Sequence, residues 1–179
     1  MADEVEWLNE EQLDSWITLA GLMFKLPGAL DYQLQRDSGL THFEYTVLAM
    51  LSDSPGRSLR MSNLAGAANG SLSRLSHVVK RLERRGFVQR RPSEDDGRIT
   101  VATLTDTGFE ELAAAAPGHV ATVRKFVIDV LSPEQLRELK VISELILEKV
   151  DPSKACEKPL SADRPSGGGD GAAQERMQG

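Results

Sequence analysis

Apolar residues recur at three- and four-residue spacing from residue 8 to residue 37, the pattern of an amphipathic helix. A second apolar row runs along the same segment, so the helix is expected to be buried on more than one side, in part by a partner chain. Pro27 and Gly28 fall inside the segment and predict a kink or a short break. The first row consists of Leu13, Trp16, Ile17, Ala20, Met23, Phe24, Leu30 and Leu34, and the second of Leu19, Leu22 and Leu26.

A second helix is predicted from Thr41, because Glu44 three residues later completes a capping box. It is expected to end before the turn-rich stretch SDSPGRS. Residues 61–69 then form a short segment of mostly small side chains that predicts another helix, and Asn69-Gly70 marks a tight turn.

The segment after this turn predicts a longer basic helix over residues 72–85, capped by Ser71 and ended by Gly86. A short helix, a glycine turn and a longer helix are typical of a helix-turn-helix. The face expected to meet the core carries Leu72, Leu75, Val79 and Leu82, with Val78 at its border. The opposite face offers side chains suited to base edges and phosphates, namely Ser73, Arg74, His77, Lys80, Arg81 and Arg84.

Two β-prone runs, FVQRR and ITVATLT, flank the tip SEDDGR and predict an antiparallel hairpin of residues 87–91 and 99–104. Asp95-Asp96-Gly97 is typical of a turn, so the tip is expected to project. Arg98 follows the tip and suits the negative potential of a narrow minor groove. We expect Asp96 to hold the Arg98 guanidinium in place through a charge-assisted hydrogen bond, although an ordinary solvated turn would carry the same residues.

The remaining chain predicts helix from residue 105 or 106 to about residue 131, with an interruption at Pro117-Gly118 that is expected to produce a kink. Ser132 then caps a last helix, with Gln135 three residues later completing its capping box. From residue 151 the sequence is rich in glycine, proline and charge, which predicts a disordered tail over residues 151–179.

Charge is distributed unevenly along the 179 residues, whose net charge is −6. Residues 57–98 contain ten Lys or Arg and four acids, a local balance of +6 that leaves −12 for the rest. Phosphate affinity depends on where positive charge lies, so this segment favours nucleic acid despite the acidic total. A merely solvated basic face remains the alternative.

Other classes of protein find little support in the sequence. No apolar run is long enough to span a membrane, and the acidic N-terminus lacks signal-peptide order, so a cytoplasmic protein is expected. The single cysteine, Cys156, excludes an internal disulfide. No catalytic triad spacing, phosphate loop or dinucleotide motif is present, and the three histidines are dispersed. We therefore expect neither an enzyme nor a bound metal or cofactor.

The stretch RMSNLAGAANGSLSRLSHVVKRLERRGFVQRRPSEDDGRITVATLTDTG resembles the winged helix-turn-helix of MarR-family regulators. The specific matches are SLSRLSHVVKRLERRGFVQRR, then Asp96-Gly97-Arg98 as the Asp-x-Arg wing signature, then LTDTG as the LT-x-x-G that opens the next helix. The resemblance extends over about residues 10–150. It implies a mostly α fold with a small β-wing, a winged helix-turn-helix assembled as an obligate-type helical homodimer.

The same resemblance implies a division of the chain. Residues 8–37 would form an N-terminal dimerisation helix and residues 41–108 the winged helix-turn-helix. Residues 106–150 would supply C-terminal dimerisation helices, followed by the tail over residues 151–179.

The function implied is that of a sequence-specific dimeric transcriptional regulator, a repressor released from a near-palindromic double-stranded operator by a small, often aromatic effector. Its DNA-binding residues would be Arg60, Ser71, Ser73, Arg74, His77, Lys80 and Arg81, with Asp96, Gly97 and Arg98 in the wing. Its effector pocket would draw on Trp16, Met23, His42, Phe43 and Tyr45, although core packing is the more ordinary role for the apolar ones. A ligand-independent regulator or activator of the same family stays open, as does a winged-helix module that binds protein.

Overall fold

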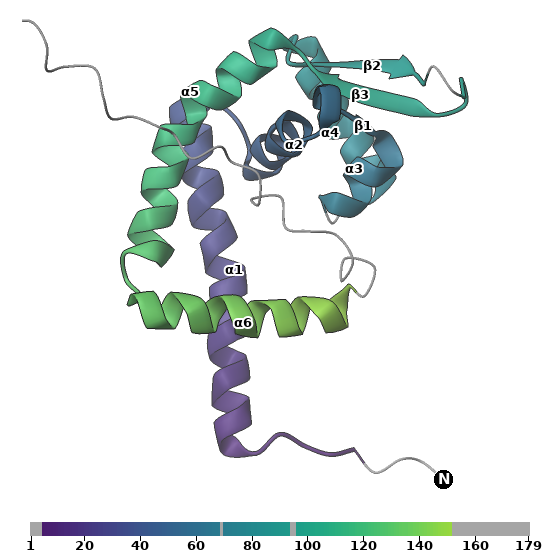
Figure 1. Ribbon diagram of the computed structural model, residues 1–179. Helices are drawn as coiled ribbons and strands as arrows, with labels where there is room; N and C mark the ends of the chain where they lie inside the picture. Colours follow the sequence, from purple (N-terminus) through teal and green to yellow (C-terminus); the bar gives the residue numbers. More distant parts are fainter. Residues whose placement is uncertain (1–4, 69, 94–95, 152–179) are drawn as a thin grey trace, which may run out of the picture. The chain divides into compact units, whose positions relative to one another are not determined.

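Helices and a small antiparallel sheet make up the part of the chain that the computed structural model describes, residues 5–68, 70–93 and 96–151 (Figure 1). This arrangement confirms the predicted mostly α fold with a small β-wing. The helices are α1 (Glu10–Ser38), α2 (His42–Ser52), α3 (Met61–Ala67), α4 (Leu72–Arg84), α5 (Asp106–Val123) and α6 (Pro133–Val150). The strands are β1 (Ser58–Arg60), β2 (Val88–Pro92) and β3 (Thr100–Leu104).

The sheet has the order β1-β3-β2, and both outer strands run antiparallel to β3. The predicted hairpin is confirmed as β2 and β3, in register with Val88 opposite Leu104. Strand β1 was not predicted, because three residues are too few to show an alternating pattern and they follow a turn-rich stretch. Its side-chain link to β3 is a 2.8 Å hydrogen bond between the hydroxyls of Ser58 and Thr103.

The core lies between the helix-turn-helix, α2 and the sheet. Its fully buried side chains include Leu48 and Leu51 of α2, and Leu75, Val79 and Leu82 of α4. The expected core face of α4 needs one correction, because Leu72 is 54% exposed whereas Val78 is only 6% exposed. Leu72 lies in the first turn of α4. Only the turns that follow bury their apolar side chains in the core.

Helix α1 is continuous from Glu10 to Ser38, so of the kink or short break predicted at Pro27-Gly28 the break is wrong. Asn9 and Gln12 form a capping box at its start, and Gly39 ends it with φ of +63°. Proline removes one backbone donor from the helix. The helix nevertheless continues, because its C-terminal half packs on α2 and α5 and buries Leu34.

Helix α5 also continues through Pro117-Gly118, so the predicted interruption is wrong, whereas the expected kink agrees with the change of direction along the helix (Figure 1). The irregular segment lies later, in a π-helical turn at Arg124–Ile128. A Cβ added at Gly118 would lie 3.0 Å from Gln33 Nε2 of α1. Glycine at this position therefore permits the close approach of α1 and α5.

The capping box predicted at the start of α6 is confirmed. The backbone amide of Ser132 donates to Gln135 Oε1 at 2.9 Å, and the amide of Gln135 donates to Ser132 Oγ at 3.2 Å. Of the tail predicted over residues 151–179, all but Asp151 lies outside the described residues. Among the described helices, none combines the length and hydrophobicity needed to cross a bilayer.

Candidate nucleic-acid interface

Helix α4 is fixed at both ends by its own capping residues. Ser71 Oγ accepts a hydrogen bond from the Arg74 amide at 3.2 Å, as predicted for the N-cap. At the other end Gly86 has φ of +76°, and the amides of Gly86 and Phe87 donate to the carbonyls of Glu83 and Leu82, each at 2.9 Å. These bonds form a Schellman motif, which sets where the helix ends and the hairpin begins.

The burial of one side of α4 leaves its polar side facing solvent. Leu75, Val79 and Leu82 are fully buried and lock the rotation of the helix about its axis. The structure therefore brings together on one exposed surface the α4 residues predicted to contact DNA: Ser73, Arg74, His77, Lys80 and Arg81, with Ser71 at the N-cap. Their hydroxyl, imidazole, ammonium and guanidinium groups match the donors and acceptors that recognise bases and phosphates.

Two arginines of this surface contact α2, which the sequence did not indicate. The Arg74 guanidinium lies 4.7 Å from the centre of the Phe43 ring. Arg81 Nε donates to Glu44 Oε1 at 3.0 Å, and Glu44 is only 5% exposed. Glu44 was recognised as the capping residue of α2, a role that is confirmed by its bond from the Thr41 amide at 2.9 Å.

Several other basic residues are paired with the protein's own carboxylates. Arg57 lies 3.0 Å from Asp106, Arg85 lies 3.5 Å from Glu111, and Arg90 lies 2.6 Å from Glu83. Arg57, Arg85 and Arg90, three of the ten basic residues of the 57–98 segment, are therefore paired within the chain. The local charge counted from the sequence overstates what this segment offers to phosphates.

The wing tip differs from its prediction in one respect. Asp96 Oδ1 accepts a hydrogen bond from the backbone amide of Arg98 at 3.0 Å, instead of binding the guanidinium. An Asp side chain that binds the amide two residues later shapes the turn itself. Asp96 thus sets the backbone from which Arg98 projects, and Asp96, Gly97 and Arg98 are all exposed.

Arg60 is the last residue of β1 and the N-cap residue of α3, as expected for a side chain at the start of that helix. It pairs with Val101 in the sheet and its side chain is exposed. It lies at the helix-turn-helix, but on a different element from the α4 surface.

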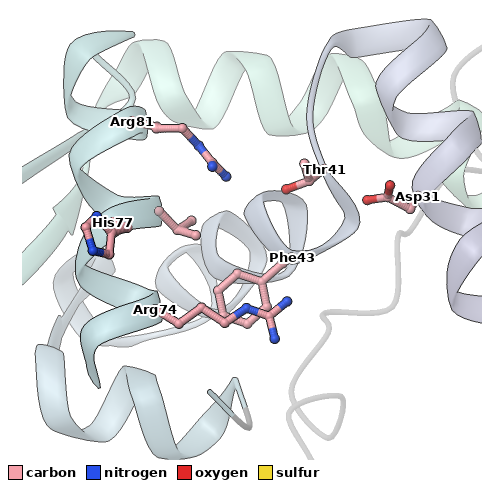
Figure 2. A pocket seen from close by; sticks show the side chains of 7 residues that line it. Asp31, Thr41, Phe43, Arg74, His77 and Arg81 are labelled. Atoms are coloured by element: carbon pink, nitrogen blue, oxygen red, sulfur yellow. The ribbon is translucent and has the colours of Figure 1, made fainter. Parts of the chain in front are cut away.

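A pocket of about 350 Å³ lies between α1, the start of α2 and α4 (Figure 2). Of the five predicted effector residues, only Phe43 lines it. Trp16 and Met23 are about half exposed on α1, and His42 and Tyr45 instead contact His119 of α5. The lining is formed by Asp31, Thr41, Phe43, Arg74, His77, Val78 and Arg81.

His42, Tyr45 and His119 form a ring cluster where α2 meets α5. The centre of the His119 ring lies 4.4 Å from that of Tyr45 and 5.8 Å from that of His42. Burial lowers the pKa of both histidines, an effect that Asp31 partly opposes at His42 and that His42 reinforces at His119. Both imidazoles are therefore held in the neutral form.

This cluster predicts that the fold loses stability in mild acid. Because both folded-state pKa values are lowered, the unfolded chain binds protons more readily below its ordinary histidine pKa of about 6.5. The melting temperature should hold above that pH and fall as the pH drops through it. His119→Phe keeps a ring beside Tyr45 and should flatten this dependence between pH 7.5 and 5.5.

A winged helix-turn-helix DNA-binding protein is defined by three features: the three-stranded sheet with its β2-β3 hairpin, the paired helices α3 and α4, and the exposed polar surface of α4. The MarR family profile matches residues 40–100. The chain is 38% identical over 106 residues to the HTH-type transcriptional repressor Rv2887 of Mycobacterium tuberculosis, an alignment that covers 59% of this chain and 74% of the repressor.

Two solved structures from Streptomyces coelicolor extend this similarity to the whole fold. The MarR-family regulator Sco3205, solved in complex with DNA, is 44% identical, with a TM-score of 0.81 over 85% of this chain and 95% of that one. The MarR-family regulator AbsC is 39% identical, with a TM-score of 0.78 over 83% of this chain and 99% of that one. The chain therefore belongs to the MarR family, whose members are DNA-binding transcriptional regulators and not enzymes.

Proposed function

We propose that the protein is a dimeric repressor that reads a near-palindromic operator in the major groove with α4 and in the flanking minor groove with the wing tip. The observation that carries this proposal is the exposed polar surface of α4, held in place by the fully buried side chains of Leu75, Val79 and Leu82. Similarity to Rv2887, named as a repressor, and to Sco3205, solved with DNA, supports it. An activator with the same interface would bind DNA in the same way.

The dimer is supported by the apolar side chains that the single chain leaves exposed on two helices. Soluble monomers rarely expose large contiguous apolar patches. A two-fold partner covering residues 8–37 and 106–150 would bury them and set the recognition helices about 34–36 Å apart, one turn of DNA. The side chains are Leu13, Trp16, Ile17, Met23 and Phe24 on α1, and Val141, Ile142, Leu145, Ile146 and Leu147 on α6.

The pocket beside α4 is the proposed site for a small aromatic effector. It offers the Phe43 ring together with the guanidinium groups of Arg74 and Arg81. Because both arginines also belong to the α4 surface, an occupant that bound them would oppose DNA binding. His42 and Tyr45 would take part only indirectly, from the other side of α2.

The test is fluorescence anisotropy of the protein on the intergenic DNA beside its own gene and on a scrambled duplex, at two salt concentrations. Preference for the intergenic duplex at both concentrations is the expected result, since sequence-reading contacts persist while phosphate contacts weaken with salt. If both duplexes bound with equal affinity and both lost binding at the higher salt, the protein would offer only a basic surface, which would contradict the proposal.

Arg98→Ala should weaken operator binding by about 1–3 kcal/mol and remove any preference for A·T-rich flanks.

Asp96→Ala should also weaken binding, because it removes the acceptor that shapes the turn before Arg98. Asp96→Asn is the matched control, since it keeps an acceptor and removes only the charge. Operator titrations in which Asp96→Ala binds more tightly than the wild type would show that charge repulsion outweighs the shaping of the turn.

A further inference from the structure

We propose that Phe43 and Glu44, two adjacent residues at the start of α2, are positioning residues that set Arg74 and Arg81 of α4 in the geometry that reads the operator. The inference rests on the proposed function, because it assigns the two arginines to operator recognition. It adds one requirement for recognition: the neighbouring helix α2 must orient the arginines of the recognition helix α4.

The spacing of the four residues fits this role. Arg74 and Arg81 are seven residues apart, so they lie about two turns apart on one side of α4. Phe43 and Glu44 are consecutive and point in directions about 100° apart around α2. Each therefore meets a different turn of α4, and Figure 2 shows both arginine side chains extending from α4 towards the start of α2.

Glu44 is held so firmly that it can act as a fixed point. Its Oε2 accepts from the backbone amide of Thr41 at 2.9 Å and from the Thr41 hydroxyl at 3.0 Å, while its Oε1 accepts from Arg81 Nε at 3.0 Å. A buried carboxylate is stable only with such partners. The bond to Glu44 uses Nε of Arg81, and the side chain of Arg81 remains 48% exposed, so its terminal amino groups are left to bind DNA.

Phe43 is fixed by a different contact. A Cβ added at Gly70, just before α4, would lie 3.1 Å from Phe43 Cζ. The ring therefore packs against Gly70, and its centre lies 4.7 Å from the Arg74 guanidinium carbon. A cation over an aromatic face is attracted without losing its hydrogen-bond donors, so Arg74 keeps its planar donor group for a base or phosphate.

Orienting Arg74 and Arg81 before DNA binds should affect sequence specificity more than it affects affinity for unrelated DNA. An arginine side chain loses considerable rotamer freedom when it is immobilised, and an arginine that is already oriented loses less on binding. Bidentate contact with a base demands a fixed geometry, whereas a phosphate tolerates many. Loss of the α2 contacts should therefore reduce binding to the operator and leave binding to unrelated DNA unchanged.

The experiment compares Glu44→Gln and Phe43→Leu with the wild type on an operator selected from random duplexes and on a scrambled duplex. Glutamine can still complete the capping box, and leucine keeps apolar volume beside Gly70. Each variant should bind the operator about three- to tenfold more weakly and the scrambled duplex as the wild type does. A scan of single operator substitutions should show Glu44→Gln losing discrimination at the positions where Arg81→Ala loses it, and Phe43→Leu where Arg74→Ala does.

The double variants test whether each pair acts as a unit. Glu44→Gln combined with Arg81→Ala should bind the operator no more weakly than Arg81→Ala alone, because residues in contact are not additive. Glu111→Gln, which removes the partner of Arg85 in the same region, is the control and should leave operator discrimination unchanged. Melting temperatures of all variants separate altered recognition from altered folding.

Three results would overturn the inference. Equal losses on both duplexes, with lower melting temperatures, would assign Phe43 and Glu44 a structural role only. Tighter operator binding by Glu44→Gln would show that the ion pair withholds Arg81 from DNA. A wild type without operator preference would contradict the proposed function itself, whereas a discriminating wild type with unaffected variants would contradict the positioning role alone.

Discussion

Replacing Gly108 by alanine is expected to cause a large loss of stability. Gly108 is buried in the first turn of α5, where its amide donates to the Thr105 hydroxyl at 3.0 Å. A Cβ at this position would lie 2.1 Å from the carbonyl oxygen of Phe87 and 2.8 Å from Leu104 Cδ1. The first of these is a backbone atom, so a side-chain rotation cannot relieve the contact.

Neither side of this contact can move without breaking other bonds. The Phe87 carbonyl accepts from the Thr105 amide at 3.0 Å, and the Thr105 hydroxyl donates to the Gly86 carbonyl at 2.7 Å. These bonds tie the start of α5 to the end of α4. Overpacking usually lowers the free energy of unfolding by about 1–3 kcal/mol. This clash should cost about 3 kcal/mol or more, which would lower the melting temperature by about 6–12 °C or more.

Gly66→Ala is the matched control, because Gly66 is helical and nothing lies within 4 Å of an added Cβ. Helix propensity alone favours alanine over glycine by about 1 kcal/mol. The control should therefore melt at or above the wild-type temperature, while Gly108→Ala melts well below it. Similar melting curves for both variants would show that α5 can shift away from Phe87.

Features encoded by residues close in sequence were predicted well. The capping boxes that begin α2 and α6 each join residues three positions apart, and both are present. Ser71 and Gly86 bound α4 as expected, since caps and left-handed glycines act within one turn. The recognition helix and the hairpin were accessible to sequence analysis for this reason.

Features that depend on distant residues were not predicted. Nothing near Arg81 in sequence indicates that its partner is Glu44, 37 positions away. The prolines of α1 and α5 predicted kinks or breaks, and both helices nevertheless remain continuous because they pack against each other and against α2. Helical periodicity identifies which face of a helix is apolar, but not which element covers it, so the candidate effector residues were placed in one pocket although they contact different neighbours.

Ile17→Glu is expected to disrupt the proposed dimer. Ile17 is 58% exposed in the single chain and lies on the apolar side of α1 beside Leu13 and Trp16, which are also about half exposed. In a two-fold dimer the substitution occurs twice, so two carboxylates would enter the interface. Burial of an unpaired charge is costly, and a loss of about 3 kcal/mol or more would weaken dimerisation by at least about 100-fold.

The consequence for DNA binding follows from the linkage of two half-sites. A dimer presents its second recognition helix at high effective concentration, and separated protomers lose that advantage. Light scattering should detect the monomer at micromolar protein, and operator affinity should fall much further than scrambled-duplex affinity. Thr18→Glu places the same side chain one residue later, about 100° around the exposed helix, and should leave the dimer intact. If Ile17→Glu remained dimeric and bound the operator normally, the apolar side of α1 would not be the interface, and the partner contact would have to lie elsewhere on the chain.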